Sequence, residues 1–299
     1  MKVFVTGASG FVGSAVVPEL LAAGHQVVGL ARSDKSAAKV AATGAEVLRG
    51  SLDDLNTLRK GAEESEGVIH CAFIHDFSNY MASAEVDRRA IELFGDVLAG
   101  SNRPFVVTSG TAGLAPGRLA TEEDIAPAGS PRFSESTGLL LASRGIRVSI
   151  MRLPPSVHGQ GDHGFVPQLI NIARQKGVSA YVGEGLNRWA AGHRVDAARL
   201  YRLALEIAPT GARLHAVGDE GVTSREIAEV IGHHLNLPVV SIPVEQVDEH
   251  FSWLGRFFSL DMAASSNLTQ EQFDWHPTQP GLIADLEQGH YFNQPVITS

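Results

Sequence analysis

Lys2-Val-Phe-Val-Thr-Gly-Ala-Ser-Gly-Phe-Val-Gly13 is the stretch that decides the fold. Its apolar residues before Gly7 read as a short buried strand, and an apolar pattern of helical period begins directly after Gly13. Gly7 permits a sharp turn, Gly10 lets backbone approach a pyrophosphate, and Gly13 lets a helix lie close to the sheet. The free N–H groups and dipole of that helix favour a phosphate. The stretch therefore predicts a phosphate-binding turn between the first strand and the first helix.

Composition excludes several classes of protein. The chain has 299 residues and a net charge of −9, which argues against a general nucleic-acid or anionic-membrane surface. Its single cysteine, Cys71, excludes an intramolecular disulfide and fits a reducing compartment. The first predicted strand leaves no room for a signal peptide, and no apolar run reaches about 18 residues. We therefore expect a cytoplasmic protein whose partner is a small molecule, with no nucleic acid and no membrane.

Strand and helix patterns alternate along the first two thirds of the chain. This alternation predicts right-handed βαβ units and a Rossmann-type, doubly wound parallel sheet. We expect residues 1–155, with 191–217 returning to them, to form a dinucleotide-binding domain, and residues 156–190 and 218–299 to form a smaller C-terminal substrate domain. The strands expected after the first are Gln26–Leu30, Ala45–Leu48, Gly67–Ala72, Arg103–Ser109, Arg147–Arg152 and Leu214–Val217.

Ligands of open α/β sheets bind beyond the carboxyl ends of the strands, so the segments that follow the strands should meet in one cleft. Arg32 lies about 20 residues beyond Gly13, where a cation suits the 2′-phosphate of NADP(H) better than the free hydroxyl of NAD(H). The sequence therefore predicts NADP(H). The expected cofactor contacts are Gly7, Ser9, Gly10, Phe11, Val12, Gly13, Arg32, Ser33, Leu52, Cys71, Ala72, Phe73, Thr108, Pro154 and Val157.

Several landmarks together resemble one superfamily, the extended and atypical short-chain dehydrogenase/reductases of the epimerase/dehydratase type. Thr6–Gly13 resembles its TGxxGxxG turn, and Arg152–Gly159 its R-P-x-x-V-Y-G segment. His193–Asp196 is similar to its H-V-D-D helix start, and Trp275–Thr278 to its C-terminal G-W-x-P stretch. The resemblance spans nearly the whole chain and implies a nicotinamide-dependent oxidoreductase.

One departure from that family affects the chemistry. Its members usually donate a proton from the Tyr of a Y-x-x-x-K motif, in which the Lys lowers the Tyr pKa. The matching positions here are Phe133 and Thr137, which have neither the phenol nor the ammonium. The family's substrate-binding Ser falls on Gly110, with Ser109 and Thr111 on either side. The resemblance thus indicates the cofactor and leaves the proton donor open.

Four histidines are candidates to replace that donor, and two of them are His75, on the loop after the fourth strand, and His193, which could reach from the second domain. His158 and His163 follow the sixth strand, where substrate is expected, and Ser109 or Thr111 can orient a substrate oxygen. No H-E-x-x-H or similar set predicts a metal site.

Three functions remain open. The first is an NADP(H)-dependent reductase of a carbonyl-type small molecule with a non-tyrosine proton donor. The second is a non-catalytic NADP(H)-binding sensor, which the missing Tyr and Lys favour. The third is a nucleotide-sugar epimerase or dehydratase, which ranks lower because it usually relies on that tyrosine. The predicted helix Tyr80–Leu98 is a candidate surface for a homodimer.

Overall fold

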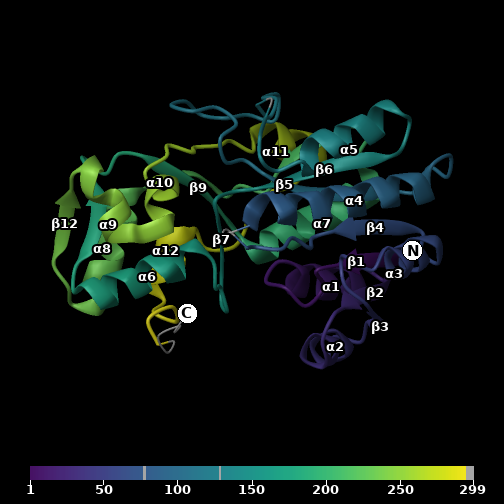
Figure 1. The fold of residues 1–299 in the computed structure, drawn as a ribbon, viewed down its shortest axis with the longest axis horizontal. Helices are drawn as coiled ribbons and strands as arrows, with labels where there is room; N and C mark the ends of the chain where they lie inside the picture. The colour runs from purple at the N-terminus through teal and green to yellow at the C-terminus, as the bar shows by residue number, and fades with distance from the viewer. Residues whose placement is uncertain (77–78, 128, 294–299) are drawn as a thin grey trace.

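The molecule has two parts, and a seven-stranded parallel sheet forms the centre of the part on the right in Figure 1. The computed structural model describes residues 1–76, 79–127 and 129–293. The strand order is β10-β6-β5-β4-β1-β2-β3, so the chain winds outward in both directions from β1, as the sequence predicted. The strands are β1 (Lys2–Thr6), β2 (Gln26–Ala31), β3 (Glu46–Arg49), β4 (Gly67–His70), β5 (Phe105–Gly110), β6 (Val148–Leu153) and β10 (Arg213–His215).

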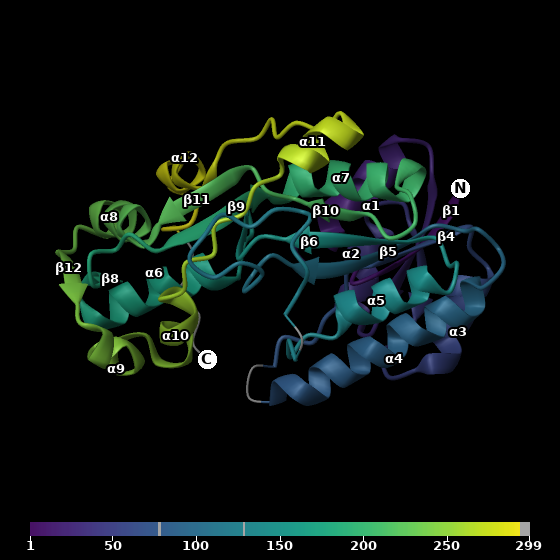
Figure 2. The ribbon, with the colours of Figure 1, turned by 90° about the horizontal axis from the view of Figure 1, so that it is seen from above.

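Helices cover both faces of this sheet, as Figure 2 shows. Successive side chains of a strand point to opposite faces. In β1, Val3 and Val5 pack in one buried cluster with α1 (Gly13–Ala22) and α7 (Arg194–Ile207). Phe4 packs in the other cluster, against the helices on the opposite face. Those helices are α3 (Leu55–Glu63), α4 (Tyr80–Leu98) and α5 (Ser134–Ser143), while α2 (Asp34–Ala41) connects β2 to β3.

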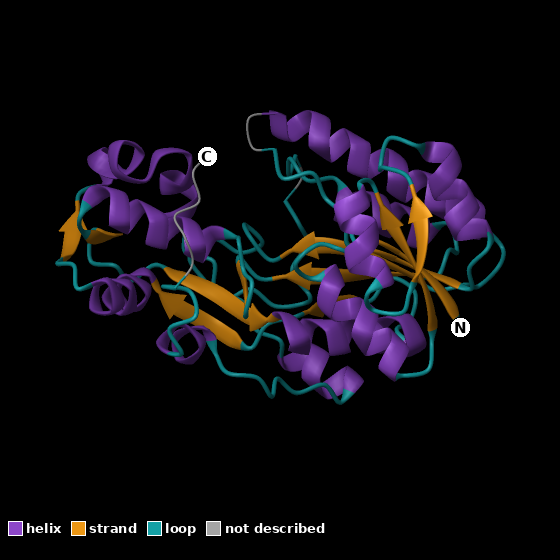
Figure 3. Cartoon of the chain, turned by 90° about the horizontal axis from the view of Figure 1, so that it is seen from below, coloured by secondary structure: helices purple, strands orange, loops and turns teal. Residues whose placement is uncertain are grey.

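A second apolar core gathers later parts of the chain around two small sheets, with strand order β11-β9-β7 and β12-β8. Figure 3 shows these strands apart from the fan of the main sheet. The sequence did not predict them. The strands are β7 (Ser156–His158), β8 (Ser179–Val182), β9 (Arg188–His193), β11 (Asp219–Thr223) and β12 (Val239–Ile242). The helices are α6 (Phe165–Lys176), α8 (Ser224–Leu235), α9 (Val247–Phe251), α10 (Gly255–Phe258), α11 (Asn267–Phe273) and α12 (Leu282–Glu287), with 3₁₀ turns at Val244–Gln246 and Ser252–Leu254.

The helix α7 and the strand β10, which pairs with β6 in the main sheet, lie within residues 191–217. The division into residues 1–155 with 191–217 and residues 156–190 with 218–299 stays a prediction, and 294–299 lie outside the described residues. Among the helices that the structure describes, none is both long and apolar enough to cross a membrane.

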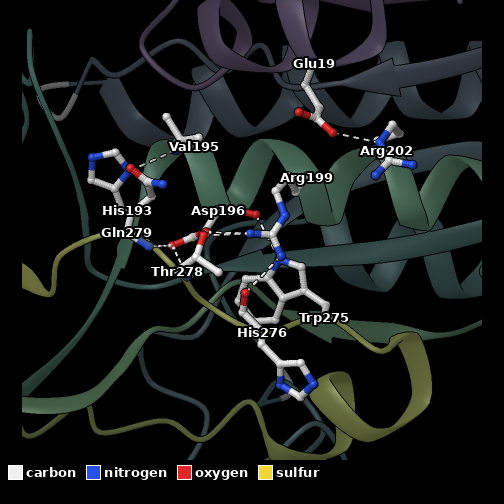
Figure 4. A network of polar contacts seen from close by, with 10 residues as sticks. All are labelled: Glu19, His193, Val195, Asp196, Arg199, Arg202, Trp275, His276, Thr278 and Gln279. Atoms are coloured by element: carbon white, nitrogen blue, oxygen red, sulfur yellow. Dashed lines mark hydrogen bonds and ion pairs between the residues drawn. The ribbon is translucent and has the colours of Figure 1, made fainter. Parts of the chain in front are cut away.

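Two landmark segments of the sequence meet at α7 (Figure 4). The buried Asp196 accepts hydrogen bonds from the backbone N–H groups of Thr278, at 3.1 Å, and Gln279, at 2.9 Å. The indole Nε1 of the fully buried Trp275 donates to the carbonyl of Asp196 at 3.0 Å. These bonds satisfy a buried carboxylate with main-chain donors, and they fasten the C-terminal segment to the main sheet's helix layer.

Candidate active site

The glycine-rich turn is held together by backbone contacts that leave no room for side chains. Gly7 has a φ of +69°, and a Cβ there would lie 2.8 Å from the backbone nitrogen of Ala72. A Cβ on Gly13 would lie 2.1 Å from the carbonyl oxygen of Gly7. Gly10 is exposed, and Val12, which directly precedes α1, makes no side-chain capping bond to the helix. The backbone N–H groups of Ser14 and Ala15 already donate to the carbonyls of Gly10 and Val12. Those of Phe11, Val12 and Gly13 have no backbone acceptor among the described residues, so they are available to a pyrophosphate.

The end of β2 presents a cation beside this turn. Arg32 is exposed and follows Ala31, the last residue of β2. Within the described ranges it forms no ion pair. The neighbouring Ser33 hydroxyl accepts from the backbone N–H of Ser36 at 3.2 Å, and it is thereby engaged in capping α2. Of this predicted pair, Arg32 is the side chain left to bind a phosphate.

Buried hydroxyl groups form hydrogen bonds at the ends of β4 and β5. Thr108 Oγ1 donates to the carbonyl of His70 at 2.6 Å, and Tyr201 of α7 lies 2.7 Å from the same hydroxyl. Burial raises the pKa of the adjacent Cys71 thiol to about 12, so this cysteine is a protonated wall residue and not a nucleophile. Thr108 and Cys71 thus shape the inner wall of the predicted cleft.

Two hydroxyls follow at the end of β5. Ser109 is 6 % exposed and Thr111 is 2 % exposed. In the part of the chain that the structure describes, Thr111 Oγ1 has no hydrogen-bond partner. A buried hydroxyl without a partner costs free energy, so a ligand oxygen placed within hydrogen-bond distance of it would be stabilised.

A buried polar network underlies this wall and reaches the start of α5. Thr6 Oγ1 lies 2.7 Å from His70 Nδ1, and His70 Nε2 lies 3.1 Å from Asp87 Oδ1. Ser134 Oγ donates to the other Asp87 oxygen at 2.6 Å. The bonds join β1, β4, α4 and α5, so they fix the position of Phe133, which directly precedes α5 and which the sequence pattern predicts to match the family's tyrosine.

Sequence reasoning missed Arg132, which extends this network along the carboxyl edge of the sheet. Its Nε donates to Ser134 Oγ at 2.9 Å, and its Nη2 donates to the carbonyl of Thr108 at 3.1 Å. Its guanidinium carbon lies 4.4 Å from the ring centroid of Phe73, a cation–π distance. The available signal was its place directly before Phe133, but its partners are too distant in sequence to be inferred.

Three loops meet around His75, at the carboxyl edge of the main sheet. Its ring lies 5.3 Å from that of Phe73. Desolvation lowers the pKa of His75, and the charges of Arg132 and His163 lower it further. These side chains come from the loops after β4, before α5 and after β7, and they meet at the carboxyl edge of the sheet.

The structure separates the candidate histidines His158 and His163. His163 is exposed, and its ring lies 5.8 Å from the ring of Phe11 in the glycine-rich turn. His158 is 1 % exposed, and its Nδ1 lies 2.9 Å from Asp285 of α12. His163 therefore borders the predicted cofactor site, whereas His158 is part of a buried hydrogen-bonded cluster.

That cluster fastens the loop carrying His163 to the C-terminal segment. The backbone N–H of Gly159 donates to the hydroxyl of Tyr291 at 3.0 Å. Burial raises the pKa of Asp162 to about 6. Asp285 and Tyr291 are distant from the loop in sequence, and nothing in the local pattern indicated them.

No described group of three or more His, Cys, Asp or Glu side chains is arranged to hold a metal ion.

The other predicted cofactor contacts lie at the carboxyl edge of the main sheet or in the segments that follow its strands. Ser9 and Val12 lie in the glycine-rich turn, Leu52 follows β3, Ala72 follows β4, Pro154 follows β6, and Val157 lies in β7.

Comparison with known proteins identifies the family. Residues 3–97 match the NAD dependent epimerase/dehydratase family. An uncharacterized protein of Schizosaccharomyces pombe is 51 % identical over 98 % of this chain and all of its own length. A 4-hydroxy-2-methyl-3-oxo-4-farnesyl-3,4-dihydroquinoline-1-oxide ketoreductase of Stigmatella aurantiaca is 31 % identical, over 59 % of this chain and 56 % of the relative.

Solved structures share the fold. The Thermus thermophilus UDP-glucose 4-epimerase, solved in complex with NAD, superimposes with a TM-score of 0.76 and 21 % identity, over 98 % of this chain and 99 % of the epimerase. The glycine-rich turn, the sheet order and these similarities agree: the chain belongs to the NAD dependent epimerase/dehydratase family.

Proposed function

We propose that this protein is an NADP(H)-dependent oxidoreductase that reduces the carbonyl of a small molecule. The observation that carries the proposal is the meeting of an open phosphate-binding turn with Arg132, His75 and an exposed His163 at one edge of the sheet. Reduction is also the chemistry named in the Stigmatella relative, a ketoreductase. When bound, the cofactor supplies the hydride.

The cofactor's phosphates have matching groups on this chain. The N–H groups at the start of α1 bind the pyrophosphate, because Gly7, Gly10 and Gly13 bring the backbone close without side chains. Arg32 binds the 2′-phosphate, since it is exposed at the end of β2 and carries no ion pair within the described residues.

His163 supplies the proton that a reduced carbonyl oxygen must gain. A general acid needs access to the reacting oxygen, and the exposed imidazole of His163 beside Phe11 has that access. Ser109 and Thr111 orient the substrate oxygen from the end of β5. His158 is buried against Asp285 and holds the loop that carries His163.

A non-catalytic NADP(H) sensor is the second candidate, because Phe133 and Thr137 stand in place of the family's tyrosine and lysine. Thr137 is buried in α5, and its neutral hydroxyl cannot supply the positive charge of a lysine to a nicotinamide ribose. An epimerase or dehydratase ranks lower, since it needs the missing tyrosine most.

Binding and turnover together test the proposal. Arg32→Asp is expected to weaken NADPH binding about tenfold or more while changing NADH binding less than about twofold. Lys39→Asp is the matched control, because it makes the same charge change on the exposed side of α2. Equal losses for both cofactors would show that Arg32 does not bind the 2′-phosphate. NADPH that binds without being consumed across a panel of ketones and aldehydes would favour the sensor.

A further inference from the structure

We propose that Arg132 is the substrate-binding cation of this cleft, and that it selects carbonyl compounds that also carry a carboxylate. The inference rests on the proposed reductase function and names the class of its substrate. It concerns a side chain that lies outside the glycine-rich turn and outside the Phe133 and Thr137 positions.

The guanidinium is fixed on one side and available on the other. Nε is bonded to Ser134, Nη2 to the Thr108 carbonyl, and the plane rests against Phe73. Arg132 is half-buried, and its Nη1 makes no hydrogen bond within the described ranges of the chain. A fixed guanidinium loses little rotamer freedom on binding, and its planar fork matches the two oxygens of a carboxylate.

Arg132 differs in its charge balance from the arginines that are paired with a carboxylate, and among the described residues it shares the lack of such a partner with the half-buried Arg103 and Arg147. Arg152 is fully buried and paired with Glu135, and Arg188 is paired with Asp261 at 2.8 Å. Within residues 1–76, 79–127 and 129–293, no carboxylate lies within ion-pair distance of Arg132. The nearby Asp87 has both oxygens engaged, by His70 and Ser134. A partly buried cation without a counter-ion is a site for an anion.

The position of Arg132 separates it from the cofactor's 2′-phosphate. Arg32 follows β2, whereas Arg132 is bonded to β5, and the order β2-β1-β4-β5 puts three strand spacings between them. This is about 14 Å, since neighbouring strands lie about 4.8 Å apart. Arg32 therefore faces the adenosine end of a bound dinucleotide, and Arg132 faces the end where substrate reacts.

The chemistry balances with groups already named. With NADPH bound, its hydride would form a C–H bond at the carbonyl carbon, and the π electrons of the C=O bond would move to oxygen. His163 donates a proton to that oxygen and regains one from water. The substrate carboxylate stays unchanged, held by Arg132, and the products are a hydroxy acid and NADP+.

The test compares acids with their neutral esters. A series of 2-oxo and 3-oxo acids and their methyl esters is assayed with the NADPH-loaded wild type, Arg132→Gln and Arg132→Lys. Arg132→Gln is expected to raise KM for the acids by about 10- to 100-fold and to change KM for the esters by less than about twofold. Arg132→Lys is expected to fall between wild type and Arg132→Gln, because it keeps the charge and loses the fork.

Arg103 provides a matched structural control. It also donates to main-chain carbonyls beside β5, at 2.9 Å to Ala62 and 2.7 Å to Ser65, but it precedes the strand and lies at its opposite end. Arg103→Gln should lower stability without changing the preference for acids. If Arg132→Gln behaves like Arg103→Gln, Arg132 is only structural and the inference is wrong.

Calorimetry separates this inference from the reductase proposal. Acetoacetate is titrated into the wild type and Arg132→Gln, each saturated with NADP+. Binding that Arg132→Gln abolishes, in a protein that reduces nothing, would support the anion site and overturn the reductase. Turnover of esters as fast as acids in both proteins would keep the reductase and overturn the anion site. Loss of NADPH affinity in Arg132→Gln, with an unchanged acid-to-ester ratio, would assign Arg132 to the cofactor.

Discussion

The glycine-rich turn and the start of α5 lie at the same edge of the sheet but are held in different ways. Gly7 to Gly13 are constrained by backbone contacts with one another and with the residues after β4. Arg132 and Ser134 are held by side-chain bonds to Thr108 and Asp87, which lie 24 and 47 positions away. The glycine-rich turn is therefore shaped mainly by residues that are near one another in the sequence. The side chains at the start of α5 depend on segments that come together only in the folded protein.

Substituting glycines tests how strictly the turn is constrained, and it carries the largest expected effect. Gly13→Ala places a Cβ about 2 Å from the Gly7 carbonyl, so backbone must move. We expect NADPH affinity to fall about 100-fold or more, together with the melting temperature. Gly10→Ala meets only the Gly7 oxygen at 3.1 Å, so it should keep the fold. Calorimetric titration and thermal melts measure both; NADPH binding by Gly13→Ala at wild-type strength would contradict the account.

Removing the Asp87 carboxylate tests the hydrogen bonds that hold the start of α5 in place. Asp87→Ala leaves the buried His70 and Ser134 without their partner, and we expect a loss of about 3 kcal/mol in the free energy of unfolding. Ser134→Ala should cost about 1 kcal/mol. Urea denaturation of the single and double variants gives the coupling energy. Additive losses would mean that the α5 start is not held by this bond.

Acid conditions should weaken the main sheet by a smaller amount. Burial lowers the pKa of His215 in β10 to about 4, and the positive charge of Arg152 lowers it further. The unfolded chain therefore binds a proton on this residue between about pH 6.5 and 4 that the folded chain does not, so stability falls as pH falls through that window. We expect a loss of about 2 kcal/mol between pH 7 and pH 5 from this residue. His215→Gln should flatten this part of the pH–stability curve; an unchanged slope would exclude His215 as its source.

Sequence patterns predicted the elements whose signals are local. The alternation of strands and helices predicted the parallel, doubly wound arrangement of the main sheet. The short strands β7, β8, β9, β11 and β12 were not predicted. They have 3 to 6 residues each, and the β11–β9 pairing contains an irregularity in register.

The candidate site divides in the same way. Gly7 to Gly13 and Arg32 were proposed from the sequence, because each proposed role depends on position relative to one strand. Arg132 was not, because its partners Thr108 and Phe73 come from other strand ends. The sequence also did not indicate that His158 is buried and His163 exposed, since the burial of His158 depends on its contact with Asp285 in α12.

The measurement that tests the central claim most directly is stoichiometric NADPH oxidation, with the hydroxy product quantified, by the wild type and His163→Ala. His163 is exposed, so its removal should change stability by less than about 0.5 kcal/mol and leave NADPH binding intact. The account predicts one hydroxy product for each NADPH consumed by the wild type, and a rate about 100-fold lower for His163→Ala. A wild-type protein that binds NADPH and consumes none with any carbonyl offered would contradict it.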